Sequence, residues 1–174
     1  MMPLLSVVGK KGSGKAEVLE ALIACLSKKG FRIGVIKDLA RDDIEIDEPG
    51  KDTYRYRTQG AETVILAGKK RLAIFSNLRE ETSLENLLKI FQGFDLVMLE
   101  GYFLDEIPKI EVHKRELGIS PLAGRMKNIF AICSDRQTCF DIPHFYFSQM
   151  NELAALIEEG LLSSKFAFIG RESK

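Results

Sequence analysis

The feature that most constrains the fold is a glycine-rich turn between an apolar run and a helical pattern, in the stretch SVVGKKGSGKAEVLEAL at residues 6–22. The turn closely matches the GxxxxGK[ST] pattern of a phosphate-binding loop. Its residues are Gly9, Lys10, Lys11, Gly12, Ser13, Gly14, Lys15 and Ala16. In such a loop, backbone N–H groups curl around an anion and the following helix adds its N-terminal partial positive charge. We therefore expect the amides of residues 10–16 to hold a nucleotide's phosphates and the Lys15 ammonium to reach the β and γ phosphates.

The last position of this turn departs from the pattern, because Ala16 stands where a Ser or Thr hydroxyl normally coordinates Mg²⁺. Alanine offers no oxygen to a metal ion. Phosphate oxygens, water and carboxylates from elsewhere in the chain remain as ligands for Mg²⁺. The sequence therefore predicts nucleotide binding with a weakened or displaced metal site, and at most slow hydrolysis of the nucleotide.

Strand-like and helix-like segments alternate along the chain. Apolar runs of strand length are found at residues 4–8, 32–36, 63–67, 71–75, 96–99, 107–112, 129–133 and 145–147. Helical periodicity is found at residues 18–26, 84–91 and 150–157. Strands separated by helices predict an α/β fold with a mostly parallel sheet flanked by helices, of the P-loop NTPase type. The runs LLSVV, VILA and LVML lack alternation, which predicts strands buried on both faces.

Length, charge and cysteine count favour one soluble domain over residues 1–174, which is long enough to bury a core. Lys plus Arg and Asp plus Glu each total 25, so the net charge is zero, which argues against nucleic acid or a membrane surface as the partner. No apolar run approaches the ~18 residues of a membrane-spanning helix. The three cysteines lack CxxC spacing, so we expect free thiols and a cytoplasmic location.

Acidic residues directly follow two of the predicted strands. Glu100 and Gly101 follow DLVML, and Asp38 follows IGVIK. Because ligands of a parallel sheet lie beyond the carboxyl ends of its strands, these positions favour a role at the nucleotide. We expect Glu100 to be the catalytic residue that orients a water, Asp38 and Glu100 to be metal ligands, and Gly101 to let backbone approach the γ-phosphate. Solvated strand ends are the alternative interpretation of these acids.

Asp135 follows the predicted strand at residues 129–133 in the same way. A carboxylate at this place would accept hydrogen bonds from the N1–H and the exocyclic amine of guanine, a donor pair that adenine lacks. Asp135 is therefore a candidate for nucleotide-base recognition, and an ordinary loop aspartate is an equal alternative.

The segment from residue 38 to residue 57 is the least regular part of the chain. Residues 38–52 are acidic, carry Pro49-Gly50 and lack a clear period, which predicts a long functional loop with a short strand at residues 44–46. The sequence KDTYRYR at residues 51–57 has helical spacing. It is either a solvated helix face or an anion site, since Arg side chains suit phosphate.

Several stretches in this order resemble one family. They are SVVGKKGSGK, FRIGVIKD, EIDEPGKDTYRYRTQGAETVIL, DLVMLEGYF and IPKIEVHK. Together they are similar to the MobB family, the GTP-binding accessory proteins of molybdopterin-guanine dinucleotide biosynthesis, over roughly residues 4–135. The segment from Asp47 to Asp52 is the most distinctive part of the resemblance.

The resemblance implies a compact nucleotide-binding fold that forms homodimers, binds GTP and hydrolyses it weakly. It also implies partners in molybdenum cofactor synthesis, above all a MobA-like guanylyltransferase that transfers GMP onto molybdopterin. By position, Lys15 and its loop would bind phosphate, and Glu100 with Gly101 would close the γ-phosphate end. The residues lining the loop that faces the nucleotide or molybdopterin would be Asp47, Lys51, Asp52 and Arg55.

Two departures from the family pattern lie in the expected metal and switch region. Family members usually keep Ser or Thr at the place of Ala16, and they often carry histidines where this chain has DLARD at residues 38–42. Both departures weaken the expectation of hydrolysis more than the expectation of binding.

Two other function classes remain open on the sequence alone. The first is an ATP-dependent small-molecule kinase or ligase related to dethiobiotin synthetase, with a substrate pocket at residues 51–57. Such an enzyme needs an intact metal site, and Ala16 counts against it. The second is a scaffold whose phosphate loop has degenerated.

Overall fold

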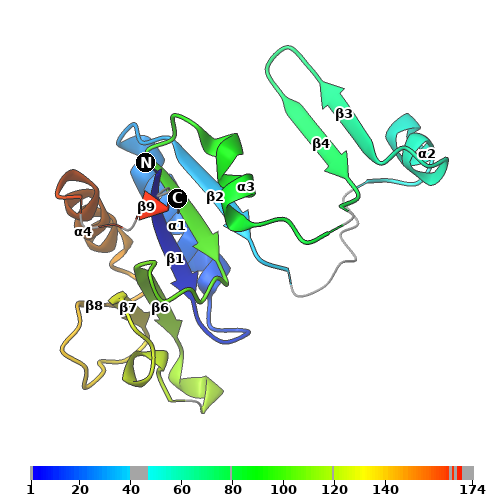
Figure 1. The fold of residues 1–174 in the computed structure, drawn as a ribbon. Helices are drawn as coiled ribbons and strands as arrows, with labels where there is room; N and C mark the ends of the chain where they lie inside the picture. The colour runs from blue at the N-terminus through cyan, green and yellow to red at the C-terminus, as the bar shows by residue number, and fades with distance from the viewer. Residues whose placement is uncertain are drawn as a thin grey trace, which may run out of the picture. The chain divides into compact units, whose positions relative to one another are not determined.

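The chain folds into two compact units, Met1–Leu39 with Leu88–Lys174 and Ala40–Leu87 (Figure 1). A computed structural model describes residues 2–39, 47–78, 80–118, 120–164, 166 and 168–169. The predicted short strand at residues 44–46 lies outside the described residues. That the whole chain folds as a single domain stays a prediction, and each unit is described by itself below.

A mostly parallel sheet forms the centre of the first unit. Six of its strands lie in the order β2-β5-β1-β6-β7-β8, every neighbouring pair is parallel, and β9 pairs antiparallel with β1. The strands are β1 (Met2–Val8), β2 (Ile33–Lys37), β5 (Leu96–Glu100), β6 (Lys109–His113), β7 (Ile129–Ser134), β8 (His144–Phe145) and β9 (Phe168–Ile169). The predicted α/β class with a mostly parallel sheet is confirmed. One edge of the sheet is formed by the carboxyl ends of β1, β2, β5, β6 and β7.

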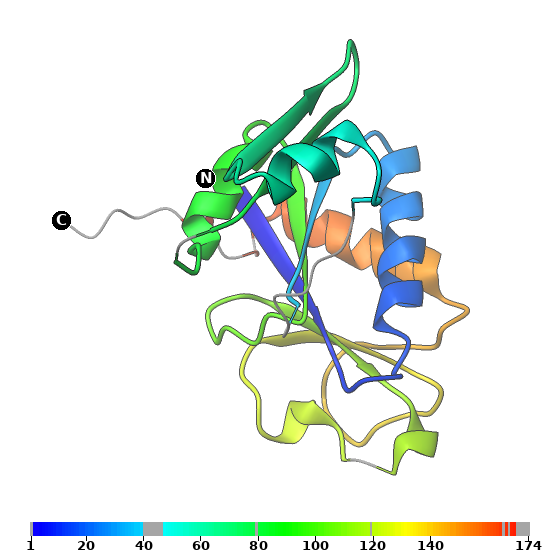
Figure 2. The same cartoon turned by 90° about the vertical axis from the view of Figure 1, so that its right-hand side faces the viewer.

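Two long helices, α1 (Lys15–Lys28) and α4 (Met150–Leu162), pack side by side on one face of this sheet (Figure 2). The apolar stripe predicted for the first helix is buried, and Leu22 and Leu26 are fully inaccessible. The helix ends as its sequence predicts. Gly30, at φ +93°, donates its N–H to the carbonyl of Ser27, and the next N–H reaches the carbonyl of Leu26.

The opposite face of the sheet is covered near β2 by a short 3₁₀ helix, η1 (Lys89–Phe91). Ile33 belongs to the core cluster that α1 covers, so Gly34 faces the other way. A Cβ at Gly34 would lie 2.3 Å from the Phe91 ring, which shows how closely η1 packs there. Two further 3₁₀ turns, η2 (Arg115–Leu117) and η3 (Leu122–Gly124), lie between β6 and β7.

The central strands are buried as their apolar sequences predict. The side chains of LLSVV in β1 and LVML in β5 are inaccessible to solvent. Cys133 in β7 is also fully buried, and this burial raises the pKa of its thiol to about 12. Because the thiolate is the reactive form, Cys133 is a structural rather than a chemical residue. All three cysteines are free, as expected.

Two charged side chains of β6 are buried, which the sequence did not indicate. The Lys109 ammonium donates to the carbonyls of Ile107 and Lys127 at 2.7 and 3.2 Å, and burial lowers its pKa. The Glu111 carboxylate accepts the N–H groups of Leu122 and Ala123 at 2.5 and 2.8 Å. Glu111 therefore holds the start of η3 against the sheet.

The second unit contains α2 (Asp52–Thr58), the antiparallel hairpin of β3 (Thr63–Ala67) and β4 (Leu72–Ser76), and α3 (Leu84–Leu88), whose last residue belongs to the first unit. The expectation that VILA is buried on both faces is wrong. Ile65 and Ile74 face each other across the hairpin and are 57% and 52% exposed. An apolar run without alternation does not specify what covers it, and Ile65 and Ile74 stay exposed among the described residues of this unit.

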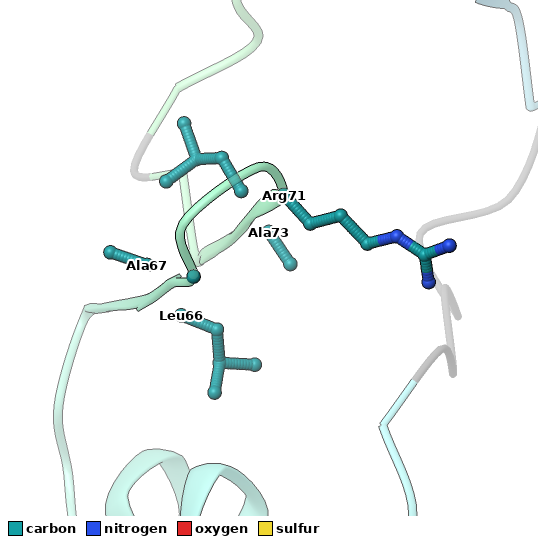
Figure 3. Close-up of a pocket in the computed structure, with 6 residues that line it drawn as sticks. Leu66, Ala67, Arg71 and Ala73 are labelled. Atoms are coloured by element: carbon teal, nitrogen blue, oxygen red, sulfur yellow. The ribbon is translucent and has the colours of Figure 1, made fainter.

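The tip of the hairpin carries a shallow hollow of about 460 Å³, shown in Figure 3. It is lined by Leu66, Ala67, Gly68, Arg71, Leu72 and Ala73. Its walls are mainly apolar, and the Arg71 side chain extends away from them (Figure 3).

Among the described helices, none is long and apolar enough to cross a bilayer.

Candidate phosphate-binding site

The glycine-rich turn connects β1 to α1 at the carboxyl-end edge of the sheet. Ser13 donates its N–H to the carbonyl of Lys10 at 3.1 Å, which closes the turn, and the N-cap Gly14 offers no side chain to the helix. The first N–H groups of α1 therefore lack a capping side chain, which leaves them for an anion. This is the backbone arrangement that the sequence predicts for residues 9–16.

The turn is pressed against the neighbouring strand β6. A Cβ at Gly9 would lie 2.3 Å from the carbonyl oxygen of Val112 and 2.6 Å from the Ser13 hydroxyl. No side chain fits at such distances, so the path of the loop requires glycine at this position. The Ser13 hydroxyl is buried and has no hydrogen-bond partner among the described residues. A bound anion would supply the missing acceptor.

The Lys15 ammonium folds back over its own loop. It donates to the carbonyls of Gly9 at 2.9 Å and Lys10 at 3.0 Å. Burial lowers the pKa of Lys15, the nearby Glu100 carboxylate opposes this effect, and the Lys37 ammonium adds to it. Lys15 is therefore placed inside the loop, where an incoming phosphate would exchange with the two carbonyls.

The two predicted acidic residues lie at the carboxyl ends of the neighbouring strands β2 and β5. Lys37 and Glu100 are paired in register, and their side chains form an ion pair with 3.3 Å between Nζ and Oε2. Asp38 donates its N–H to the carbonyl of Glu100 at 2.9 Å, and Gly101 donates its N–H to the carbonyl of Val7 at 3.1 Å. The sequence reasoning missed Lys37. The pair depends on the register of β2 on β5, which a single strand's sequence does not reveal.

The residues present make a poor metal site by themselves. Within the described part of the chain, no group of three or more His, Cys, Asp or Glu side chains is placed to hold a metal ion. Ala16 contributes no oxygen, and one oxygen of Glu100 faces Lys37. Asp38 and Glu100 alone fit Mg²⁺ only if phosphate oxygens and water provide the remaining ligands.

Asp47, in the second unit, uses its carboxylate to organise the start of α2. Its side chain is 5% exposed; one oxygen accepts the Thr53 hydroxyl at 2.9 Å, and the other faces Arg57 at 3.4 Å. Arg57 also lies over the Phe75 ring of the hairpin. These contacts explain the distinctive DEPGKD segment in terms of local structure, while a role of Asp47 at the nucleotide stays a prediction.

The other predicted residues of this segment lie at the exposed surface of α2. Lys51 pairs with Glu48 at 2.8 Å, and this hydrogen bond raises the pKa of Lys51. Arg55 pairs with Asp52 at 3.2 Å, and both side chains are more than 70% exposed. Exposed pairs of this kind contribute little to stability. The structure therefore leaves Arg55 accessible to an anion and does not separate that role from a solvated helix face.

Asp135 lies after β7, as the sequence predicts, and one of its oxygens is already engaged. Oδ1 accepts the N–H of Arg115 at 3.1 Å, which fixes the turn that follows β6. In the same region the Ser134 hydroxyl and His144 Nε2 form a hydrogen bond of 2.8 Å, and burial lowers the pKa of His144. Sequence reasoning considered neither contact, because both join segments from different strands.

The family model described as "MobB: Molybdopterin guanine dinucleotide synthesis protein B" matches residues 4–135. The chain is 33% identical over 162 residues to a molybdopterin-guanine dinucleotide biosynthesis adapter protein of Haemophilus influenzae, covering 92% of this chain and 90% of that protein. It is 31% identical over 164 residues to the protein of the same name from Escherichia coli, covering 91% and 93%.

Solved structures share the fold. A crystal structure of molybdopterin-guanine biosynthesis protein B superimposes with a TM-score of 0.72 at 24% identity, over 91% of this chain and 99% of that chain. A MobB homologue from Bacillus stearothermophilus gives 0.71 at 22% identity, over 93% and 99%. The family model and the two curated relatives lead to one conclusion: the chain belongs to the MobB family.

Proposed function

We propose that this chain is an adapter protein of molybdopterin-guanine dinucleotide synthesis that binds GTP in the loop of residues 9–16. The observation that carries the proposal is the loop itself. It is pressed onto β6 at Gly9, it leaves the first amides of α1 without a side-chain cap, and it holds the Lys15 ammonium. The relatives' names favour this role over an ATP-dependent kinase or ligase.

Titration calorimetry of the full chain with GTP, GDP and ATP, each with and without Mg²⁺, tests this proposal. We expect GTP to bind in the micromolar range and more tightly than ATP. Tighter binding of ATP with substrate-dependent turnover would favour the kinase or ligase instead. Absence of binding to all three nucleotides would contradict the proposal and favour the alternative of a scaffold with a degenerated phosphate loop.

The GTPase activity is at most slow, because the metal site lacks its usual hydroxyl. Mg²⁺ would be held by phosphate oxygens and water with Asp38 and Glu100, and Glu100 would orient the attacking water. We expect Ala16→Ser to raise Mg²⁺-dependent GTP hydrolysis by about tenfold, measured as phosphate release at saturating GTP. Ala24→Ser, on the exposed side of the same helix, is the matched control and should leave the rate unchanged. An unchanged rate in Ala16→Ser would mean that Glu100 or the loop after β2 limits hydrolysis.

We propose that the chain forms a homodimer through the uncovered face of the β3–β4 hairpin. Ile65, Leu72 and Ile74 lie on one face of the hairpin and are 52–65% exposed, and a two-stranded hairpin alone is only marginally stable. Ile74→Glu should shift the sedimentation-equilibrium mass from dimer to monomer, whereas Lys70→Glu in the exposed turn should not. A monomer mass for the unsubstituted chain would contradict the proposal.

The finer partners follow from the family. We propose that a MobA-like guanylyltransferase binds this adapter, that molybdopterin binds near Arg55 and Lys51 of the second unit, and that the pathway is cytoplasmic. The exposed cations and the Tyr54 and Tyr56 rings of α2 support an anionic, flat-ringed ligand. Titrating molybdopterin and the purified guanylyltransferase into the full chain tests both contacts, and no heat with either would contradict them.

A further inference from the structure

Lys114 lies against the phosphate loop, although about a hundred residues separate the two in the chain. A Cβ at Gly14 would lie 3.4 Å from Lys114 Cε and 3.7 Å from its Nζ. A Cβ at Gly12 would likewise lie 3.8 Å from Leu117 Cδ2. The turn that follows β6 therefore runs along the flank of the phosphate loop, with the methylene stem of Lys114 beside the N-cap of α1.

One contact of the Lys114 side chain and two contacts of neighbouring residues place Lys114 beside the loop. Its ammonium lies 5.7 Å from the centre of the Phe147 ring, a cation–π arrangement. Asp135 accepts the N–H of the next residue, Arg115, at 3.1 Å. The pairing of His113 with Ser134 fixes the strand end from which Lys114 projects. Phe147 and Asp135 are therefore positioning residues, and the Lys114 side chain is oriented before any ligand arrives.

Resting on the proposed function, we propose that Lys114 is the nucleoside-binding residue, with its methylene stem covering the sugar and one face of the base. A triphosphate held by the loop would meet the N-terminus of α1, whose N-cap is Gly14, so a nucleoside attached to it would lie near Lys114. The carboxyl ends of β6 and β7, where ligands of a parallel sheet lie, are on this side. Lysine stems cover apolar surface while the ammonium finds a polar or aromatic partner, and here Phe147 is that partner.

Calorimetry with two ligands, GTP and inorganic tripolyphosphate, separates contact with the nucleoside from contact with the phosphates. In Lys114→Ala we expect GTP affinity to fall about tenfold, the effect of losing three methylene groups that pack on the nucleoside, and tripolyphosphate affinity to stay within about twofold. Lys114→Met keeps the stem without the charge and should stay within about threefold of the unsubstituted chain for both ligands. Lys127→Ala, which removes an 82% exposed lysine before β7, is the control for net charge.

Three outcomes would overturn the proposal. They are a loss of GTP affinity below threefold in Lys114→Ala, an equal loss for both ligands, and a Lys114→Met variant as weak as Lys114→Ala. If the unsubstituted chain bound GTP no better than tripolyphosphate, the nucleoside contact would be refuted, but binding of the phosphates by the loop would not be. A chain that binds neither ligand would refute the proposed function first. Thermal unfolding of each variant confirms that the fold is retained.

Discussion

Replacing Lys15 by alanine should abolish measurable GTP binding, with a loss of affinity of at least about a hundredfold. Lys15 is the side chain whose ammonium lies over the loop carbonyls of Gly9 and Lys10, where the phosphates would sit. Without it, the loop would lose the ammonium that is hydrogen-bonded to its carbonyls at the place of the phosphates. Calorimetry of the variant with GTP in Mg²⁺ measures the loss.

The matched control for this variant is Lys11→Ala, because Lys11 is an exposed lysine in the same turn whose contribution to the loop is its backbone N–H. We expect Lys11→Ala to lose no more than about threefold in GTP affinity. If Lys15→Ala kept full affinity, or if both variants lost it equally, Lys15 would not be the phosphate-binding lysine.

Replacing Gly9 by alanine should destabilise the whole first unit and remove GTP binding with it. The new Cβ would lie 2.3 Å from the Val112 carbonyl oxygen in the adjacent strand, so either the loop or β6 must move. Both are backbone and lie beside the buried core, so we expect a loss of about 3 kcal/mol in the free energy of unfolding. Urea denaturation monitored by circular dichroism measures this difference in the free energy of unfolding.

Gly30→Ala separates steric collision from the general cost of replacing glycine. Gly30 has φ +93°, and a Cβ there would meet nothing within 4 Å. Its replacement should therefore cost only the backbone strain, about 1 kcal/mol. An equal cost at Gly9 and Gly30 would show that the loop is not pressed onto β6 in solution.

Local patterns in the sequence were sufficient for much of the fold. The 3.6-residue stripe of α1 with Gly30 after its end, and the unbroken apolar run of β5, each carry their own signal within a few residues. The position of Glu100 followed from one further rule, that acids after parallel strands meet at one edge of the sheet. The stripe of α1 and the apolar run of β5 could be predicted because each depends on neighbours in the chain, and the strand end at Glu100 followed from the parallel sheet.

The features that escaped prediction depend on pairs of distant segments. VILA has the same apolar character as the buried strands, but it lies in a two-stranded sheet with β4, and Ile65 and Leu66 stay exposed. The Lys37–Glu100 ion pair requires the register of β2 on β5, and the place of Lys114 beside Gly14 requires β6 to lie beside β1. A single sequence contains neither register nor strand order in readable form.

Asp47 illustrates a different limit. The resemblance implies that it lines the loop facing the nucleotide or molybdopterin, which stays a prediction, and the structure shows its carboxylate bonded to Thr53 and Arg57 within its own segment. A motif position indicates that a residue matters but does not say whether it contacts a ligand or supports a helix. The hydrogen-bond partners of the Asp47 carboxylate show that it supports the start of α2.

The central claim is that the backbone between β1 and α1 receives a nucleoside triphosphate together with the Lys15 ammonium. A crystal structure of the full chain with a non-hydrolysable GTP analogue tests it most directly. The account predicts the triphosphate within the turn of residues 9–16, with Lys15 Nζ moved from the Gly9 and Lys10 carbonyls to a phosphate oxygen. An analogue bound elsewhere, or a Lys15 that still contacts both carbonyls beside a bound analogue, would contradict the account.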